Sequence, residues 1–279
     1  MEKWDKIIKP ERNFFQFNFL AIFNYKDLIF MFIKRDFVTY YKQTLLGPIW
    51  YLIQPLVNTI VFTVIFGNLA KIPTDGLPPF LFYMAGNVIW GYFSICLVTT
   101  SNTFVSNAGI FSKVYFPRLI VPISNILFSL LQFLIQFVFF MLFFIYFYFS
   151  GSDISFSYKM LLLPFLIFQV ALLSLGCGTI LSSLTAKYRD LTLAMTFLVQ
   201  IWLYATPIVY PLSLIPESYQ YIVCLNPMTA VVELFREIFL GKSTINFLQS
   251  IISISMTLLL VFVGLLLFNR VEKNFVDTV

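Results

Sequence analysis

The chain has 279 residues, of which 59% are hydrophobic and 11% are charged, and its mean hydropathy is +0.88. Soluble domains carry roughly 25% charged residues, so a water-soluble enzyme, a disordered protein and a fibrous protein are excluded. The chain contains no histidine and three cysteines, Cys96, Cys177 and Cys224, each inside an apolar stretch. This excludes a histidine-based metal site or catalytic triad and a disulfide framework. We expect an all-α integral membrane protein.

Long runs without charge predict where the chain crosses the membrane. Charged residues leave six runs of at least 26 uncharged residues each, and a helix crosses a hydrocarbon core of ~30 Å with about 20 residues. The six expected transmembrane helices lie near residues 47–69, 80–103, 121–149, 160–184, 191–206 and 248–268. A seventh crossing at 218–232 is not expected, because its 15 uncharged residues are too few. Extending it would also bury Glu233, Arg236 and Glu237.

The first 42 residues are expected to form a cytoplasmic N-terminal segment, and residues 43–279 a single transmembrane domain. Apolar residues recur at helical spacing from Phe15 to Tyr41, namely Phe15, Phe19, Ile22, Ile29, Ile33 and Phe37. Polar residues fall largely on another face, so the pattern predicts an amphipathic helix along the inner membrane surface. Two roles stay open: an anchor on lipid and a platform that grips a cytoplasmic partner.

Basic residues are distributed unevenly between the two sides of the membrane. With six crossings, both termini and two internal loops share one side, which holds 14 of the 18 lysines and arginines. Basic residues favour the cytoplasmic side, so both termini are predicted to be cytoplasmic. The net charge of +5 therefore reflects membrane topology, and nucleic-acid binding is not expected.

The two cytoplasmic loops, 104–120 and 185–190, are too short to form a catalytic domain. Loop 104–120 is unusually apolar around Lys113 and Arg118. Either it rests on lipid headgroups as an interfacial helix and loop, or it forms a short helix that inserts into a groove of another subunit.

Four prolines, Pro207, Pro211, Pro216 and Pro227, interrupt an apolar stretch before the last crossing. Proline ends helices, so no continuous helix is expected there. Irregular backbone at membrane depth survives only when it is packed in protein or lines a cavity. We therefore expect residues 206–241 to form two short re-entrant helices that enter from the outer face beside a translocation path. The alternative is a hairpin that lies flat on the outer surface.

Aromatic and small residues carry further expectations. Tryptophan and tyrosine near helix ends are typical of the membrane interface, but several could stack on sugar rings along a path. These candidates are Trp50, Tyr51, Trp90, Trp202 and Tyr204. The small residues Ser174, Gly176, Gly178 and Ser182 predict close helix packing.

Chemistry inside the membrane is not expected from this sequence. The cores of the six expected crossings contain no Asp, Glu, Lys or Arg, although ion-coupled carriers normally place an ionisable group there. The spacing of possible ligands offers no metal site. We expect no catalytic residue, cofactor or metal in this chain, and we expect the driving energy to come from another protein.

Three stretches together resemble one family. The first is Arg35-Asp36, then Tyr41 to Pro48, Trp50 and Gln54-Pro55. The second is Lys187-Tyr188-Arg189-Asp190. The third is Thr206 to Pro211 with Asn226 to Thr229 and Glu233 to Arg236. They resemble the permease subunit of type-2 ABC exporters for polysaccharides, which include O-antigen, capsule and teichoic acid exporters. The resemblance covers about residues 20 to 270.

This resemblance implies a homodimer of six-span subunits that binds two copies of a separate ATP-binding cassette protein. It implies a cargo of polysaccharide on polyprenyl diphosphate, moved outward across the bacterial cytoplasmic membrane. The implied contacts with the ATPase are Arg35, Asp36, Lys42, Lys113, Tyr115, Phe116, Arg118, Arg189 and Asp190. The implied outer gate comprises Pro207, Tyr210, Pro211, Pro216, Asn226 and Pro227.

Two other functions stay open. An autonomous secondary transporter or channel would need an ion or gradient site that the expected crossings do not offer. A membrane enzyme acting on lipid-linked sugars would need acid and base groups in those crossings.

Overall fold

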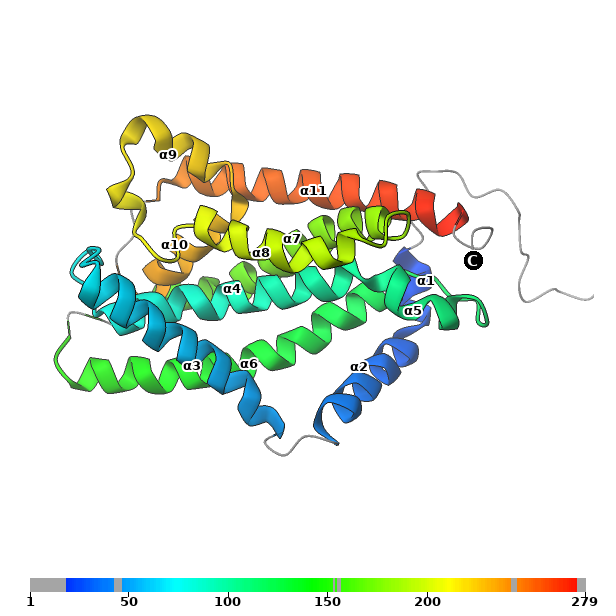
Figure 1. Cartoon of the computed structure of the whole chain (residues 1–279), viewed down its shortest axis with the longest axis horizontal. Helices are drawn as coiled ribbons and strands as arrows, with labels where there is room; N and C mark the ends of the chain where they lie inside the picture. The colour runs from blue at the N-terminus through cyan, green and yellow to red at the C-terminus, as the bar shows by residue number, and fades with distance from the viewer. Residues whose placement is uncertain (1–18, 43–46, 153, 155–156, 242–244, 275–279) are drawn as a thin grey trace, which may run out of the picture.

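The computed structural model describes residues 19–42, 47–152, 154, 157–241 and 245–274. These residues form helices and connecting turns and contain no strand (Figure 1). The α-helices are α1 (Phe19–Asn24), α2 (Lys26–Tyr41), α3 (Trp50–Phe62), α4 (Pro79–Ser101), α5 (Thr103–Phe111), α6 (Ile120–Phe149), α7 (Leu163–Thr185), α8 (Leu191–Ala205), α9 (Glu217–Cys224), α10 (Pro227–Leu240) and α11 (Phe247–Asn274). Short 3-10 turns occur at η1 (Gly47–Ile49), η3 (Tyr158–Leu162) and η4 (Leu212–Leu214), and a π-helix η2 (Thr63–Leu69) extends α3.

Among the described residues, five helical stretches are long and apolar enough to cross a membrane. They are Trp50–Leu69, Pro79–Ser101, Ile120–Phe149, Tyr158–Thr185 and Phe247–Glu272, and they agree with five of the six expected crossings. The remaining one, expected at 191–206, is the 15-residue helix α8. At 1.5 Å per residue it is about 22 Å long, which is shorter than the ~30 Å hydrocarbon core. A sixth crossing therefore stays a prediction.

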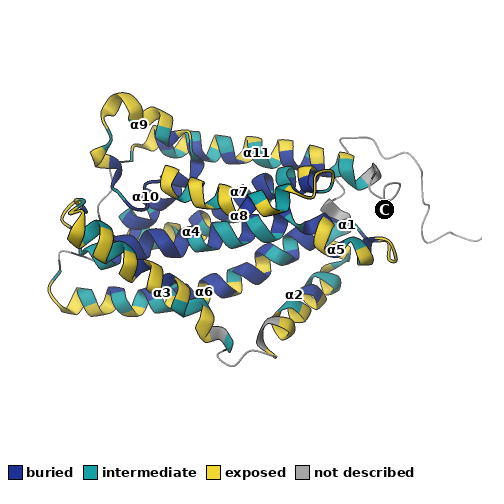
Figure 2. Cartoon of the chain, in the orientation of Figure 1, coloured by how far each residue is buried: buried dark blue, intermediate teal, exposed yellow. Residues whose placement is uncertain are grey.

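Helix α4 lies at the centre of the bundle, where it packs against α3, α6, α7 and α10. It is mostly buried, as its dark colour in Figure 2 shows. Phenylalanine rings of α6 and α10 fill the space beside it: Phe140 lies 5.5 Å from Phe235, and Phe235 lies 4.9 Å from Phe239, between ring centroids. Burial of these rings stabilises the bundle and fixes α10 in its interior.

Helix α7 packs closely against two neighbours through its small residues. A Cβ atom added to Gly178 would lie 2.6 Å from the side chain of Thr100 on α4, and one on Gly176 would lie 2.6 Å from the backbone nitrogen of Val261 on α11. Real Cβ atoms do not approach so closely, so both positions require glycine for this packing. The predicted role of this small-residue face is confirmed.

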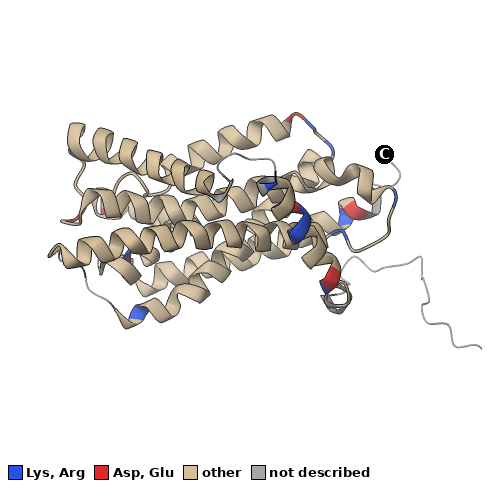
Figure 3. Ribbon diagram, turned by 90° about the horizontal axis from the view of Figure 1, so that it is seen from below, with Lys and Arg blue, Asp and Glu red and all other residues tan. Residues whose placement is uncertain are grey.

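The two ends of the bundle differ in charge. One end, which we call the α5 end, contains α1, α5 and the last turns of α11 (Figure 1). The opposite end, the α9 end, contains α9 and the turn between α3 and α4. Charged residues gather at the α5 end, whereas the middle of the bundle is almost free of colour in Figure 3. The first described helix and the end of α11 thus share one end, and its assignment to the cytoplasm stays a prediction.

The expected N-terminal amphipathic helix is divided in two. Helices α1 and α2 meet at Tyr25, and Phe15 lies outside the described residues. Helix α2 packs against α6 through Phe32, which is buried, and not through Phe37, which is exposed although the sequence pattern placed it on the apolar face. The exposed side of α2 also carries Phe30. Its position along a membrane surface stays a prediction.

Candidate functional site

Helix α8 ends at Ala205, and the chain then runs without a long helix to α9. In this stretch, which we call the outer segment (206–216), residues Thr206–Val209 are buried and Ser213 and Pro216 are exposed. Helix α10, which follows α9, is buried among α4, α7 and α11. The irregular backbone is therefore packed in protein, as membrane depth would require.

Arg236 of α10 holds the buried part of the outer segment. Its guanidinium is 1% exposed and donates from Nη1 to the carbonyl oxygen of Pro207 at 2.7 Å and from Nη2 to that of Ile208 at 2.8 Å. Nη1 also pairs with Oε1 of Glu233, which is buried as well, at 2.9 Å. The two charges are thus buried in protein although α10 is no crossing, because the ion pair and the two carbonyls satisfy Nη1 and Nη2, while Nε has no hydrogen-bond partner among the described residues.

Helix α4 forms the floor beneath this contact. The guanidinium carbon of Arg236 lies 3.6 Å from the ring centroid of Phe82, which is a close cation–π arrangement. Gly86 lies one turn further along α4, and its lack of a side chain leaves space for Ile208 and Arg236. A Cβ atom there would lie 3.0 Å from Cγ2 of Ile208 and 3.2 Å from Nη2 of Arg236. Arg236 and the outer segment are thus clamped against α4.

Asn226 links α8, the outer segment and α10. Its Oδ1 accepts from the indole nitrogen of Trp202 at 3.0 Å and from the backbone nitrogen of Met228 at 3.1 Å, and its Nδ2 donates to Oγ1 of Thr206 at 2.8 Å. The contact with Met228 is an N-cap on α10. Pro227 at the first helical position costs no hydrogen bond.

Five of the six predicted gate residues therefore lie in or beside this cluster. Pro207, Pro211 and Pro227 are buried, while Tyr210 and Asn226 are half-buried. The hydroxyl of Tyr210 donates to the carbonyl oxygen of Tyr204 at 3.2 Å. Pro216 is exposed, just before α9. The exposed part of the segment is held to the turn between α3 and α4, where Ser213 Oγ donates to Oδ1 of Asp75 at 2.8 Å.

At the α5 end, two of the predicted ATPase contacts are buried in the chain. The ring of Phe116 packs between those of Phe32 and Phe111, at centroid distances of 5.8 and 5.7 Å. Arg118 is 7% exposed, and its Nη1 donates to the carbonyl oxygen of Glu272 at 2.8 Å. These side chains hold α2, α5, α6 and α11 together, so neither is available at the surface. Their predicted direct contact with a partner stays a prediction.

The environment of Arg118 lowers its pKa through burial, and the carboxylate of Glu272 opposes that shift. A second contact, from the backbone nitrogen of Arg118 to Oε1 of Glu272 at 3.3 Å, joins the same residues. The start of α6 is thereby tied to the end of α11.

The other predicted contacts remain accessible. Lys113 and Tyr115 are exposed after α5, Tyr115 by 74%, and Arg189 and Asp190 are exposed in the turn between α7 and α8. Both turns lie at the α5 end (Figure 1). Three further candidates belong to α2 and its end. Arg35 and Asp36 form an ion pair at 2.8 Å, and Lys42 is exposed where α2 points away from the bundle.

The predicted path aromatics do not share one surface. Trp90 is buried in the core, where its ring lies 6.4 Å from that of Trp202. Tyr51 accepts a hydrogen bond from Gln132 of α6 at 2.7 Å. Only Trp50 and Tyr204 among the five present largely exposed rings. Trp90 thus packs in the core of this chain, and its place along a path stays a prediction.

Comparison with known proteins decides the family. The sequence model described as ABC-2 type transporter matches residues 27–240. The chain belongs to the ABC-2 type transporter family. The match runs from α2 to α10 and so includes both turns at the α5 end and the Arg236 cluster.

Two relatives of this ABC-2 transporter are O-antigen export permeases. The O-antigen export system permease protein RfbA of Klebsiella pneumoniae is 26% identical over 251 residues, which cover 90% of this chain and 94% of the relative. The protein of the same name from Myxococcus xanthus is 23% identical over 221 residues, covering 78% of this chain and 82% of the relative. The resemblance to permeases of polysaccharide exporters is confirmed.

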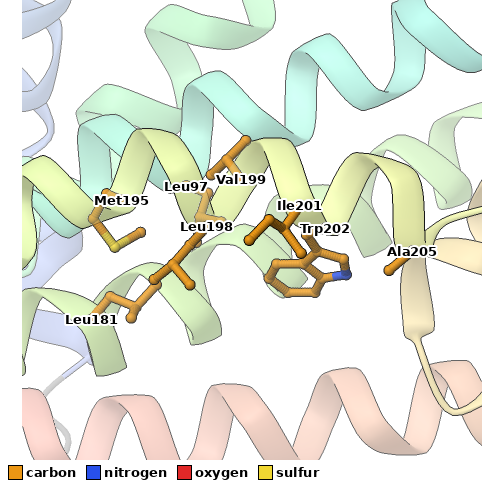
Figure 4. Close-up of a pocket in the computed structure, with 8 residues that line it drawn as sticks. All are labelled: Leu97, Leu181, Met195, Leu198, Val199, Ile201, Trp202 and Ala205. Carbon is orange, nitrogen blue, oxygen red and sulfur yellow. The ribbon is translucent and has the colours of Figure 1, made fainter.

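Two cavities of this ABC-2 transporter are lined almost entirely by apolar side chains. One of about 370 Å³ lies between α4, α7 and α8 (Figure 4), and its lining is Leu97, Leu181, Met195, Leu198, Val199, Ile201, Trp202 and Ala205. Another of about 490 Å³ lies between α6 and α7, close to Tyr92. Within the described ranges, no three His, Cys, Asp or Glu residues lie close enough together to hold a metal ion. Neither cavity thus offers a reactive pair.

Proposed function

We propose that this chain is the membrane permease of an ATP-driven exporter. It moves a polysaccharide on polyprenyl diphosphate outward across the bacterial cytoplasmic membrane. The observation that carries this proposal is the similarity to O-antigen export permeases over 90% of the chain. Similarity of that extent covers the whole bundle rather than one motif.

The α5 end is proposed as the docking site of the ATP-binding protein. Two turns that are distant in sequence, one with Lys113 and Tyr115 and the other with Arg189 and Asp190, are exposed at this end. They combine an aromatic ring with charges of both signs, which suits a protein interface. The buried Phe116 and Arg118 hold the turn between α5 and α6, so a displacement of this turn would be transmitted to α6 and α11. Residues 1–42 would lie beside this site as a cytoplasmic segment.

Two copies of the chain and two copies of the ATP-binding protein are proposed for the assembly. Helix α3 and its π-helical extension expose most of their apolar side chains, and α8 exposes Phe197 and Ile201. Apolar faces of this kind need lipid or another protein against them. A polymer passing along these faces would be enclosed if a second copy covered them.

The outer segment with α9 and α10 is proposed as the outer gate. Helix α10 is too short to cross a membrane, yet it is buried among three long helices. Helix α9 is mostly exposed and leads back to it. This pairing supports two re-entrant helices that enter from the outer side.

Reconstitution tests this function. The chain is placed in proteoliposomes loaded with lipid-linked polysaccharide, alone and with its ATP-binding protein. We expect the glycan to become accessible on the far side only with the partner and hydrolysable ATP. Movement by the chain alone would contradict the proposal and would favour a secondary transporter or channel.

The docking site has its own test. Tyr115→Ala and Arg189→Glu should each lower stimulation of the partner's ATPase at least tenfold, since they alter the exposed turns. Tyr158→Ala is the control, because Tyr158 is equally exposed but lies at the start of η3, at the other end of α7. Equal ATPase stimulation in all three variants would exclude the α5 end as the docking site.

A further inference from the structure

We propose that Arg236 is a positioning residue that fixes Thr206–Val209 to α4 and α10 as one rigid unit, so that the outer side opens only beyond the buried Leu212. The functional part of this inference rests on the proposed export activity. Its structural part concerns this chain alone and can be tested without a cargo.

The outer segment needs an anchor because of its sequence. Pro207 ends the hydrogen-bonding pattern of α8 and donates no hydrogen bond itself. The carbonyl oxygens of Pro207 and Ile208 are then left in a buried region, where an unsatisfied acceptor is costly. Arginine has five donors in a planar fork, so one side chain serves both carbonyls at once. Arg236 thus replaces the hydrogen bonds that a helix would have made.

The anchor is itself held in place. Glu233 compensates its charge at 2.9 Å, and Phe82 lies against the flat face of the guanidinium. Gly86 on α4 lies close to both Ile208 and Arg236, so the unit has little space to shift. Three residues of two helices, α4 and α10, therefore fix the Arg236 side chain, and that side chain fixes two consecutive residues of the segment.

The chain beyond Leu212 is held differently. Ser213 is exposed, and its side chain bonds to Asp75 on another turn. Asp75 has a φ of 54° and Lys71 in the same turn a φ of 53°, a conformation that non-glycine residues rarely adopt. Exposed hydrogen bonds compete with water and break more readily than buried ones. Pro211 and Leu212 are still buried, so the portion that moves is 213–216 with the exposed α9.

Thiol labelling tests the anchor directly. Val209 is buried, so Val209→Cys in an otherwise unchanged chain should react slowly with a membrane-impermeant maleimide added from outside. Peptide mass spectrometry separates the introduced thiol from the buried Cys96, Cys177 and Cys224. Adding Arg236→Gln should raise the labelling rate of the introduced thiol at least tenfold. Arg236→Lys should give a smaller increase, because an ammonium lacks the fork that spans both carbonyls.

A second variant leaves the charges intact. Gly86→Ala places a methyl group against Ile208 and Arg236 and should also raise labelling, whereas Gly109→Ala is the control, since nothing lies within 4 Å of its new Cβ atom. If the Arg236→Gln variant does not insert into the membrane, the labelling rate of the Gly86→Ala variant tests the proposal instead. Unchanged labelling in Gly86→Ala, or in a membrane-inserted Arg236→Gln variant, would overturn the proposal.

Export by the reconstituted complex shows whether Arg236 positions the segment for transport or only stabilises the fold. Variants with faster labelling should export at least tenfold more slowly while binding the ATP-binding protein normally. Faster labelling with normal export would overturn the positioning role. Should the unmodified complex move no glycan, the proposed function would fail, but the labelling series would still judge the anchor.

Discussion

A Cβ atom on Gly264 of α11 would overlap the carbonyl oxygen of Gly176 on α7. The two helices therefore meet backbone to backbone, and each glycine faces the other helix. Such contacts are a main source of helix association where lipid offers no hydrophobic driving force. In this chain the contact joins the last long helix to the centre of the bundle.

Gly264→Ala should destabilise the protein by forcing this crossing apart. Overpacking typically costs about 1–3 kcal/mol, which should lower the midpoint of thermal unfolding in detergent by several degrees. Gly109→Ala is the matched control, since nothing within 4 Å opposes its Cβ atom. A midpoint that falls equally in both variants would contradict the role of the crossing.

Arg118→Ala should also destabilise the chain, because its guanidinium joins the start of α6 to the end of α11. A hydrogen bond from a charged group contributes about 1.5–3 kcal/mol, and the variant leaves the carbonyl of Glu272 without this donor. Lys113→Ala removes an exposed charge nearby and should leave the unfolding midpoint unchanged. A stable Arg118→Ala protein with lost ATPase stimulation would instead support direct contact with the partner.

Asn226→Ala should loosen the junction of α8 and α10. It removes the N-cap of α10, for which a loss of about 1–2 kcal/mol is typical, and also the bonds to Trp202 and Thr206. Thr206→Val removes the bond to Asn226 but keeps the cap, so its thermal midpoint should fall less. Equal midpoints for the two variants would show that the cap and the Trp202 bond contribute nothing measurable.

Phe32→Ala should release α2 from the bundle, because Phe32 is buried and its ring packs on Phe116. Trypsin should then cleave at Lys26 or Lys34 severalfold faster, measured in detergent by the loss of the intact chain. Phe30→Ala removes an exposed ring on the same helix and should not change the cleavage rate. Faster cleavage of the Phe30 variant would show that its exposed face is held as well.

Five long helices were predictable because charges interrupt the sequence so rarely. Helix α8 ends one residue before the predicted end of its crossing, because the apolar run continues only through prolines that cannot extend a helix. A crossing by α8 stays a prediction. No proline or glycine in the sequence indicates that the N-terminal helix is divided at Tyr25. Phe32 is as apolar as Phe37, and only the position of α6 decides which of them is buried.

The Arg236 cluster could not be predicted fully, because the main partners of its guanidinium are backbone carbonyls. Glu233 and Arg236 would each be costly to bury as separate charges. Their spacing of three residues, however, allows the two side chains to pair on one helix face. An acidic and a basic residue three positions apart, close to a proline-rich stretch, are the feature of the sequence that could have predicted a buried ion pair here. The sequence contains no comparable feature for Arg118, because its partner Glu272 lies 154 residues away.

The length of α8 has a consequence for the surrounding bilayer. If α8 forms the predicted sixth crossing, it is about 8 Å shorter than the hydrocarbon core, so adjoining lipids would compress, or headgroups and water would descend toward Tyr204. The free-energy barrier to moving a lipid with a large polar headgroup across the membrane would be lower at such a locally thinned site than in an undisturbed bilayer. Membrane thickness is therefore a variable that should tune turnover, with thinner bilayers favouring it.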